Sequence, residues 1–177
     1  CQKAQEEFSM SCIARIVSFS ELYGGKIAAA LSRQHPRDLF DCKYMEISLF
    51  DEVKKGFILN LLGSDKPIIE SLQPNCINQS PALENQFQGM SIIEFTYKDY
   101  EQTRKNLIAI VNNSLTKTDK EFIISFEEGN PDWSKCVAGN LSNYPSVQWK
   151  LQNINKLKTD NPQKHKQDIQ TLKDFIK

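Results

Sequence analysis

The stretch Ser20-Glu-Leu-Tyr-Gly-Gly-Lys-Ile-Ala-Ala-Ala-Leu-Ser-Arg33, continued by Pro36-Arg-Asp-Leu-Phe-Asp41, decides how this chain begins to fold. Ser18 and Glu21 have the spacing of a capping box, which predicts a helix that begins here and runs to about Arg33. Pro36 predicts the first turn of a second helix. A glycine inside a helix costs about 1 kcal/mol relative to alanine. The pair Gly24-Gly25 therefore indicates that a ligand or another backbone approaches closely.

The flanking sequence predicts a short strand followed by a mostly helical assembly. The run from Ser11 to Ser18 is rich in β-branched residues and favours a strand. Capping and proline signals downstream predict further helices. These helices are expected to begin near Ser48, Thr96, Thr116, Pro145 and Pro162.

Composition excludes several classes of function. The 177 residues include 22 basic and 22 acidic side chains, so no global charge steers the chain toward nucleic acid or an anionic membrane. No apolar run reaches the roughly 18 residues that span a bilayer. Five cysteines without a C-x-x-C pair, beside two histidines, indicate neither a disulfide framework nor a zinc site. We therefore predict a cytoplasmic protein with reduced cysteines. The start at Cys1, without a leader-like pattern, predicts an internal start.

The candidate binding residues lie on the first helix. Helical phasing places Gly24 on a packing side, and it places Lys26, Ala30 and Arg33 on the opposite side. Lys26 and Arg33 are separated by about 20° around the axis and roughly 10 Å along it. Two aligned cations of this kind fit a polyphosphate or a nucleic-acid backbone.

The second helix contributes Arg37, Asp38 and Asp41. A carboxylate here could bind a divalent cation or accept a proton from an attacking hydroxyl. An ordinary structural role is the alternative. In that case Arg37 and Asp41 form an i,i+4 ion pair, Asp38 compensates the helix dipole, and the lysine and arginine of the first helix are solvated.

Weaker candidates lie elsewhere in the sequence. Trp149, Lys150, Asn153 and Lys156 are expected opposite the apolar stripe of their helix, as a nucleic-acid face or as a solvated surface. His35 precedes a proline between two predicted helices and is interpreted as structural.

The run from Ser20 to Asp41 resembles the AbiEii/AbiGii toxin family of nucleotidyltransferases. In that family a strand leads into E-L-x-x-x-K-x-x-A-L-x-x-R, followed by R-D-L-x-D. The matching positions are Glu21, Leu22, Lys26, Arg33, Arg37, Asp38, Leu39 and Asp41. Weaker similarity around Trp133 and around Val147–Leu151 extends the resemblance over nearly the whole chain.

The resemblance implies a fold and an activity. It implies a mainly α fold, in which one or two N-terminal β-strands remain from a nucleotidyltransferase α/β core and a multi-helix domain follows. Residues 1–45 would end the core, with its third and fourth motifs, and residues 46–177 would form the helical domain. Members of the family use an NTP, such as GTP, with Mg²⁺ to transfer a nucleotide, in some cases to tRNA. Several are toxins of toxin–antitoxin or abortive-infection systems.

The resemblance also assigns roles to individual residues. It implies that Lys26, Arg33 and Arg37 contact the nucleotide and that Asp38 and Asp41 belong to the catalytic centre. The family's turn with a following Asp-x-Asp pair has no counterpart in this sequence. Without those carboxylates two metal ions cannot be held. We therefore expect this chain alone to be inactive, to bind no cofactor, and to complement an upstream catalytic half. A non-catalytic RNA- or NTP-binding module and a protein-interaction module are the alternatives.

Overall fold

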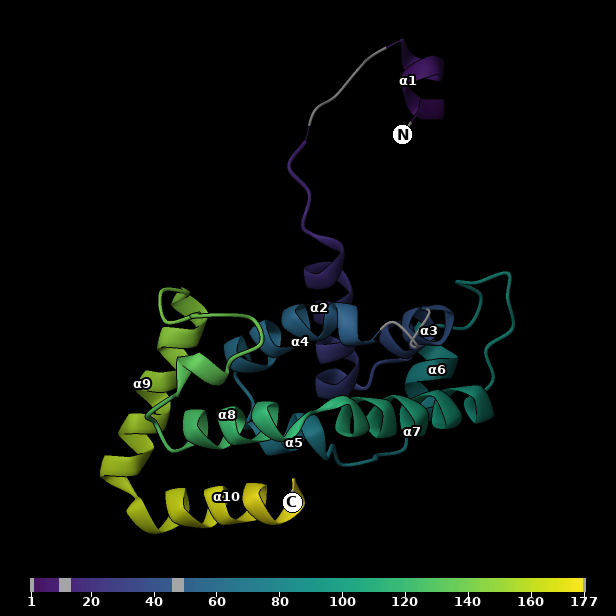
Figure 1. The fold of residues 1–177 in the computed structure, drawn as a ribbon. Helices are drawn as coiled ribbons and strands as arrows, with labels where there is room; N and C mark the ends of the chain where they lie inside the picture. Colours follow the sequence, from purple (N-terminus) through teal and green to yellow (C-terminus); the bar gives the residue numbers. More distant parts are fainter. Residues whose placement is uncertain (1, 10–13, 46–49, 177) are drawn as a thin grey trace.

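The computed structural model describes residues 2–9, 14–45 and 50–176, and it is mainly helical (Figure 1). The prediction of a mainly α, multi-helix fold is confirmed. Within the described ranges the elements follow one another without a strand. They are α1 (Gln2–Phe8), α2 (Phe19–Arg33), α3 (Pro36–Tyr44), α4 (Phe50–Gly63), α5 (Ile68–Leu72), α6 (Ser80–Gln86), α7 (Tyr97–Ser114), α8 (Lys117–Glu127), the 3₁₀ turn η2 (Trp133–Lys135), α9 (Pro145–Asp160) and α10 (Pro162–Phe175).

Local capping chemistry sets the helix boundaries. Ser18 closes the predicted capping box with Glu21, and Thr96 and Thr116 open α7 and α8 with boxes of the same kind. A proline occupies the first turn of α3, α9 and α10. The capping boxes bind backbone N–H groups that the first turn of a helix leaves free. A proline in the first turn has no N–H group that would need a partner. The predicted start of α4 at Ser48 lies outside the described residues.

The centre of the fold is a close crossing of α2 and α4. Gly24 and Gly56 meet there, and a Cβ on either one would overlap the backbone of the other helix, at Phe57 and at Ser20 respectively. The close approach that Gly24 predicts is therefore confirmed, and its partner is backbone. Around this crossing, the core buries side chains from most of the helices, among them Ile27, Leu39, Phe57, Leu61, Ile68, Tyr100, Leu107, Phe122, Val147 and Leu172.

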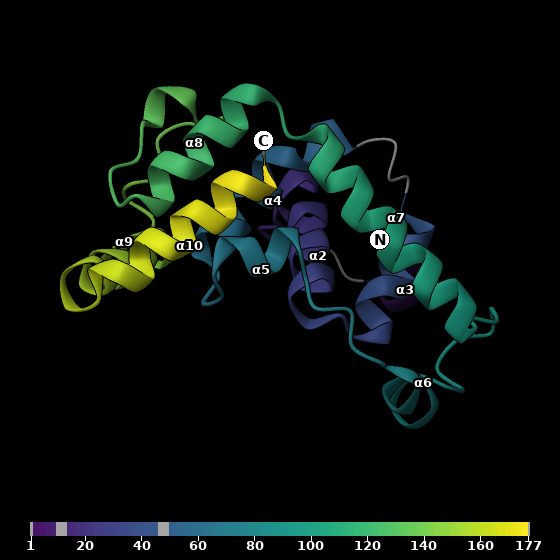
Figure 2. The ribbon, with the colours of Figure 1, turned by 90° about the horizontal axis from the view of Figure 1, so that it is seen from below.

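Helix α7 fixes the turn between α2 and α3. Gln34 ends α2 in the left-handed conformation, with φ of 52°. The Tyr100 hydroxyl donates to the Gln34 carbonyl at 2.8 Å, and the buried Arg104 guanidinium donates to the Gln34 side chain at 3.0 Å and to the Ile77 carbonyl at 2.8 Å. Seen from below, α7 runs across α2 and α3 while α9 and α10 lie toward the other end (Figure 2). Hydrogen bonds from Tyr100 and Arg104 therefore hold the turn that joins α2 to α3.

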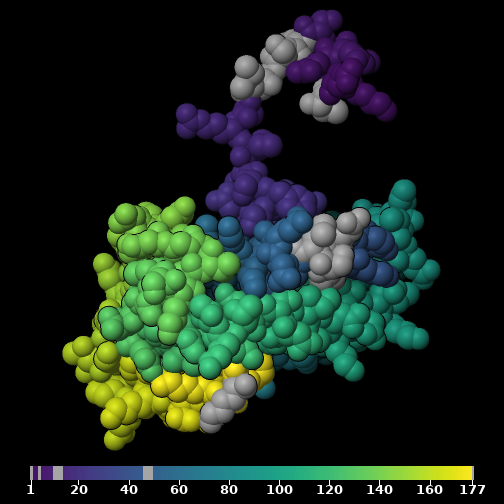
Figure 3. Space-filling model, in the orientation of Figure 1, coloured from purple at the N-terminus to yellow at the C-terminus, as the bar shows by residue number. Residues whose placement is uncertain are grey.

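The predicted N-terminal strand is not formed in its described part. Residues 14–18 have no regular secondary structure, and residues 11–13 of the predicted strand lie outside the described residues. The segment leads away from the helical body (Figure 3). A strand needs a partner to complete its hydrogen bonds, and the described part of the chain offers none. The β-branched pattern thus did not suffice to form a strand.

The predicted boundary at residue 45 separates helices that share one core. Helix α2 precedes the boundary and α4 follows it, yet their backbones come into close contact at Gly24 and Gly56. Across the described residues, no helix combines the length and the apolar character needed to cross a membrane.

Candidate functional site

Helices α2 and α3 bring the predicted cations and carboxylates together in two ion pairs. The Lys26 ammonium pairs with the Asp41 carboxylate, and both side chains are about half exposed. Arg33 binds Asp38 through two parallel hydrogen bonds of 2.8 and 3.1 Å. The hydrogen bond from Lys26 to Asp41 raises the pKa of the lysine. We call these four residues the α2–α3 charge cluster.

Arg37 takes a different partner from the one that helical spacing suggests. Its guanidinium donates to the Gln86 carbonyl at 3.2 Å, while Asp41 pairs with Lys26. The i,i+4 pair of Arg37 with Asp41 is therefore not formed. His35 caps α3 by accepting from the Arg37 amide at 3.2 Å, and its other ring nitrogen lies 2.9 Å from the Gln86 side-chain oxygen. The structural interpretation of His35 agrees with these contacts.

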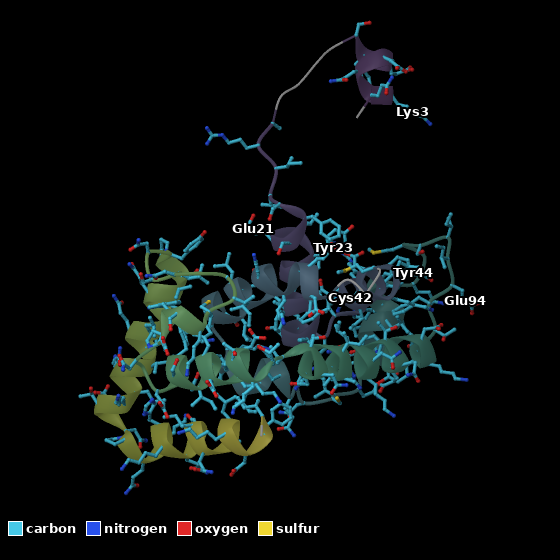
Figure 4. All side chains as sticks on the ribbon, in the orientation of Figure 1. Lys3, Glu21, Tyr23, Cys42, Tyr44 and Glu94 are labelled. Carbon is cyan, nitrogen blue, oxygen red and sulfur yellow. The ribbon has the colours of Figure 1, made fainter. Side chains whose placement is uncertain are left out.

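Ala30 was predicted beside the cations on an open face, and this prediction is wrong. Its exposed fraction is 1%. Helix α2 packs against α3, α4, α5 and α7, so its buried surface is wider than one stripe. Glu21 marks the end of α2 that projects toward the N-terminal segment, while Cys42 lies buried on α3 (Figure 4). Lys26 and Arg33 thus reach solvent from a helix whose middle and C-terminal turns are largely covered by neighbouring helices.

Opposite charges balance each other within the cluster. Each of its two cations already has a carboxylate partner, so a phosphate would have to displace Asp41 or Asp38 to bind. An exposed ion pair such as Lys26–Asp41 is worth at most about 1 kcal/mol, so displacing Asp41 costs little. Among the described residues, no three acidic, histidine or cysteine side chains form a group that could hold a metal ion. The residues present therefore do not fit a magnesium site on their own.

Two Asp-x-Glu pairs occur elsewhere, at Asp99/Glu101 and Asp119/Glu121, and both have structural roles. Asp99 and Asp119 complete the capping boxes of α7 and α8. Asp119 also accepts from the buried Lys54 ammonium at 3.2 Å. Glu101 accepts from Arg104 at 2.7 Å, and Glu121 accepts from Lys135 at 2.8 Å, so all four carboxylates bind helix ends or cations.

The structure reveals a second candidate site, a cavity of about 350 Å³ between α5, α9 and α10. Lys150 was expected on an outer face but is buried, and its ammonium donates to the carbonyls of Leu61, Ser64 and Lys66 at 3.3, 3.0 and 2.6 Å. Burial lowers its pKa to about 8. The signal was present in the sequence, because Lys150 follows Val147 by three residues and therefore lies near the apolar stripe.

Glu127, at the last turn of α8, also lines this cavity. Burial raises the pKa of its carboxyl group. Its buried Oε2 has no hydrogen-bond partner in the part of the chain that the structure describes. No pattern in the sequence singled out this residue, because its burial depends on α9 and α10 folding back.

Comparison with family models, with curated proteins and with solved structures finds no match for this chain. The similarity to the AbiEii/AbiGii family accordingly remains a resemblance carried by the residues between Ser20 and Asp41. The geometry of the two candidate sites is the remaining basis for a functional proposal.

Proposed function

We propose that this chain is the C-terminal part of a nucleotidyltransferase toxin of the AbiEii type, which transfers a nucleotide from an NTP to an acceptor such as tRNA. The observation that carries the proposal is the α2–α3 charge cluster. Lys26 and Asp41 are fifteen positions apart, and both belong to the motif that suggests the family. Arg33 and Asp38 meet across the same two helices.

In this proposal the ion pairs hold the cations ready for a triphosphate. Asp41 keeps the Lys26 ammonium at a defined place, and phosphate oxygens replace the carboxylate when the nucleotide binds. Arg33 supplies a planar fork that matches two phosphate oxygens. Release from the cation leaves the carboxylate of Asp38 or Asp41 free to accept a proton from the attacking hydroxyl. The magnesium ligands would belong to an Asp-x-Asp motif, which this sequence does not contain.

The N-terminal segment supports a second part of the proposal, the contact with an upstream catalytic half. Residues 14–18 run without regular structure, and the side chains of Ile16 and Val17 are largely exposed. Phe19 and Leu22 extend this exposed apolar surface along the first turn of α2. Such a segment fits the edge of a sheet, to which it would add both hydrogen bonds and apolar contacts.

The test uses the full gene product that contains this chain together with the upstream motifs. Lys26→Ala and Asp38→Ala should each lower the transfer of radiolabelled NTP to tRNA by about 100-fold, as expected for loss of an electrostatic catalytic contact. Lys98→Ala, which removes an exposed lysine outside the cluster, is the matched control. Thermal unfolding should remain close to that of the wild type. Full activity in both cluster variants rejects the proposal.

A protein-interaction module is the second candidate, favoured by the neutralised charges of the cluster and by the exposed apolar segment before α2. Titration with RNA at increasing salt separates the two. A phosphate-binding surface loses affinity steeply as salt rises, whereas an interaction module has no such affinity to lose.

A further inference from the structure

Helix α7 carries a buried arginine whose hydrogen bonds reach two other segments of the chain. Arg104 is only 4% exposed, and α7 packs against both α2 and α3 (Figure 2). Its Nη1 donates to the Gln34 side-chain oxygen at 3.0 Å and to the Ile77 carbonyl at 2.8 Å, and its Nη2 donates to the Glu101 carboxylate at 2.7 Å. A guanidinium is a planar fork, so these donors have fixed directions. Arg104 therefore holds Gln34 and Ile77 in one arrangement relative to α7.

Gln34 connects this arginine to the α2–α3 charge cluster, because it directly follows Arg33 in the chain. Its φ of 52° is left-handed, a conformation that a residue other than glycine keeps only where its surroundings hold it. The Tyr100 hydroxyl binds its carbonyl at 2.8 Å, and its own side-chain amide donates to the Asn75 carbonyl at 2.7 Å. Together with the bond from Arg104, these contacts fix both the backbone and the side chain of Gln34.

The Arg33–Asp38 ion pair spans the chain reversal at Gln34. Arg33 is the last residue of α2, and Asp38 lies in the first turn of α3. The Arg33 Nη2 and the Asp38 Oδ1 are 2.8 Å apart. Because only two residues separate the helices, a small rotation at Gln34 moves the whole of α3. Such a rotation displaces the carboxylates of Asp38 and Asp41 relative to the cations of α2.

Stability alone does not call for an arginine at this position. Removing a cation from water is costly, and an apolar side chain of similar volume often stabilises a protein equally well. The carboxylate partner of Arg104, Glu101, is itself close to half exposed. What the guanidinium provides, and an apolar side chain does not, is the direction of the hydrogen bonds to Gln34 and Ile77.

We propose that Arg104 is a positioning residue for nucleotide transfer, which acts through Gln34 and sets the α2 cations and the α3 carboxylates of the charge cluster in their working arrangement. The inference rests on the proposed transferase function, in which this cluster binds the triphosphate. Arg104 is buried and acts on the cluster without contact to substrate. A displacement of about 1 Å in such an arrangement lowers a rate by about 100-fold. The inference also gives a residue of α7 a role in a site that α2 and α3 form.

Backbone amide exchange of the 177-residue chain, followed by NMR, tests the positioning role without a measurement of activity. The amides of Asp38 and Leu39 donate to the His35 carbonyl at 3.0 and 3.2 Å, so they report on the first turn of α3. Arg104→Met should raise the exchange rates of these two amides by about 10-fold or more, because the turn opens locally. The amides in the centre of α9 should keep their wild-type rates.

Lys54→Met is the matched control for the loss of a buried cation. Lys54 donates to Asp119 and to the Ser114 carbonyl, and neither lies in the turn. This variant should leave the exchange of the turn amides unchanged. Arg104→Lys keeps the charge but lacks the fork, so it should give an intermediate rate, and it carries the test if Arg104→Met does not fold.

Steady-state kinetics of the full gene product with the upstream motifs test the consequence for transfer. Arg104→Met should lower kcat by roughly 10- to 100-fold and change KM for the NTP much less, since the cations that bind the triphosphate remain. Gln34→Ala should act in the same direction. The double variant should lose no more than the stronger single variant, because both changes break one contact. Lys54→Met should keep the wild-type kcat.

The outcomes separate this inference from the function on which it rests. If Lys26→Ala loses activity while Arg104→Met keeps the wild-type kcat, the positioning role is overturned and the transferase function stands. If Lys26→Ala and Asp38→Ala keep full activity, the transferase function is rejected, and the role of Arg104 in transfer with it. Unchanged exchange of the turn amides in Arg104→Met, an equal rise in Lys54→Met, or additive losses of kcat in the double variant each overturn the positioning role.

Discussion

At the residue scale, Glu127 is the clearest departure from what folding alone favours. A buried carboxyl group without a partner lowers the free energy of unfolding, because its charged form loses hydration and gains no hydrogen bond. Lys54 is buried too, but Asp119 and the Ser114 carbonyl accept from its ammonium at 3.2 and 3.1 Å. Of these two groups, only Glu127 keeps an unsatisfied buried oxygen in the described structure.

Replacement of Glu127 by glutamine should therefore stabilise the protein at neutral pH, by about 1 kcal/mol. The raised pKa of Glu127 means that its favourable contribution is complete below the unfolded pKa near 4.5 and is lost as the pH rises through the folded pKa. The difference between the Glu127→Gln variant and wild type should accordingly be largest at pH 7 and vanish near pH 4. Urea unfolding of both proteins between these values measures it. A difference independent of pH would contradict the assignment.

At the scale of elements, the crossing of α2 and α4 distinguishes two neighbouring glycines. Gly24 is buried against the backbone of α4. A Cβ on Gly25 would lie 3.5 Å from the Asn60 side chain, which is an ordinary contact. The sequence shows the two glycines as one pair, and only the packing separates a glycine required by close approach from one that is not.

Alanine at Gly56, which lies in the crossing, and alanine at Gly25, which lies beside it, should have opposite effects on the free energy of unfolding. Gly56→Ala should lower the free energy of unfolding by about 3 kcal/mol, because its Cβ would overlap backbone atoms of α2 that cannot move independently. Gly25→Ala should raise it by up to about 1 kcal/mol through helix propensity. Chemical denaturation of the two variants measures both. Equal effects of the two changes would show that the crossing is looser than described.

At the scale of the whole molecule, the described structure is a helical body from which the N-terminal segment projects (Figure 1). Helix α3, which carries Asp38 and Asp41, lies toward one end of this body, and α9 lies toward the other (Figure 2). The cluster alone lacks the carboxylates that hold two metal ions, since the sequence contains no Asp-x-Asp pair.

The 177-residue chain alone should therefore show no NTP-dependent nucleotide transfer. Incubation of the chain with Mg²⁺, tRNA and each radiolabelled NTP, followed by gel analysis, measures the activity. A separate enzyme that adds nucleotides to tRNA serves as the positive control. Labelling of tRNA by the isolated chain would contradict the prediction, because it would require a metal centre that this sequence does not provide.

Much of the helical fold could be predicted from the sequence. Capping boxes at Ser18, Thr96 and Thr116 act over three or four residues, so the local sequence determines where α2, α7 and α8 begin. The predicted strand fails in its described part because a strand depends on a partner distant in sequence. Ala30 was misplaced because the phasing of one helix does not reveal how many neighbours surround it.

The amino-acid sequence by itself determined the helices of this protein and the residue types of its charge cluster. Only the tertiary structure decided which charges meet, because pairing of Lys26 with Asp41 and burial of Lys150 depend on how separate helices pack. The same holds for the unsatisfied carboxyl group of Glu127, whose burial involves α8, α9 and α10 together. Capping and helix propensity are local interactions, whereas burial and ion pairing join residues that the chain itself keeps apart.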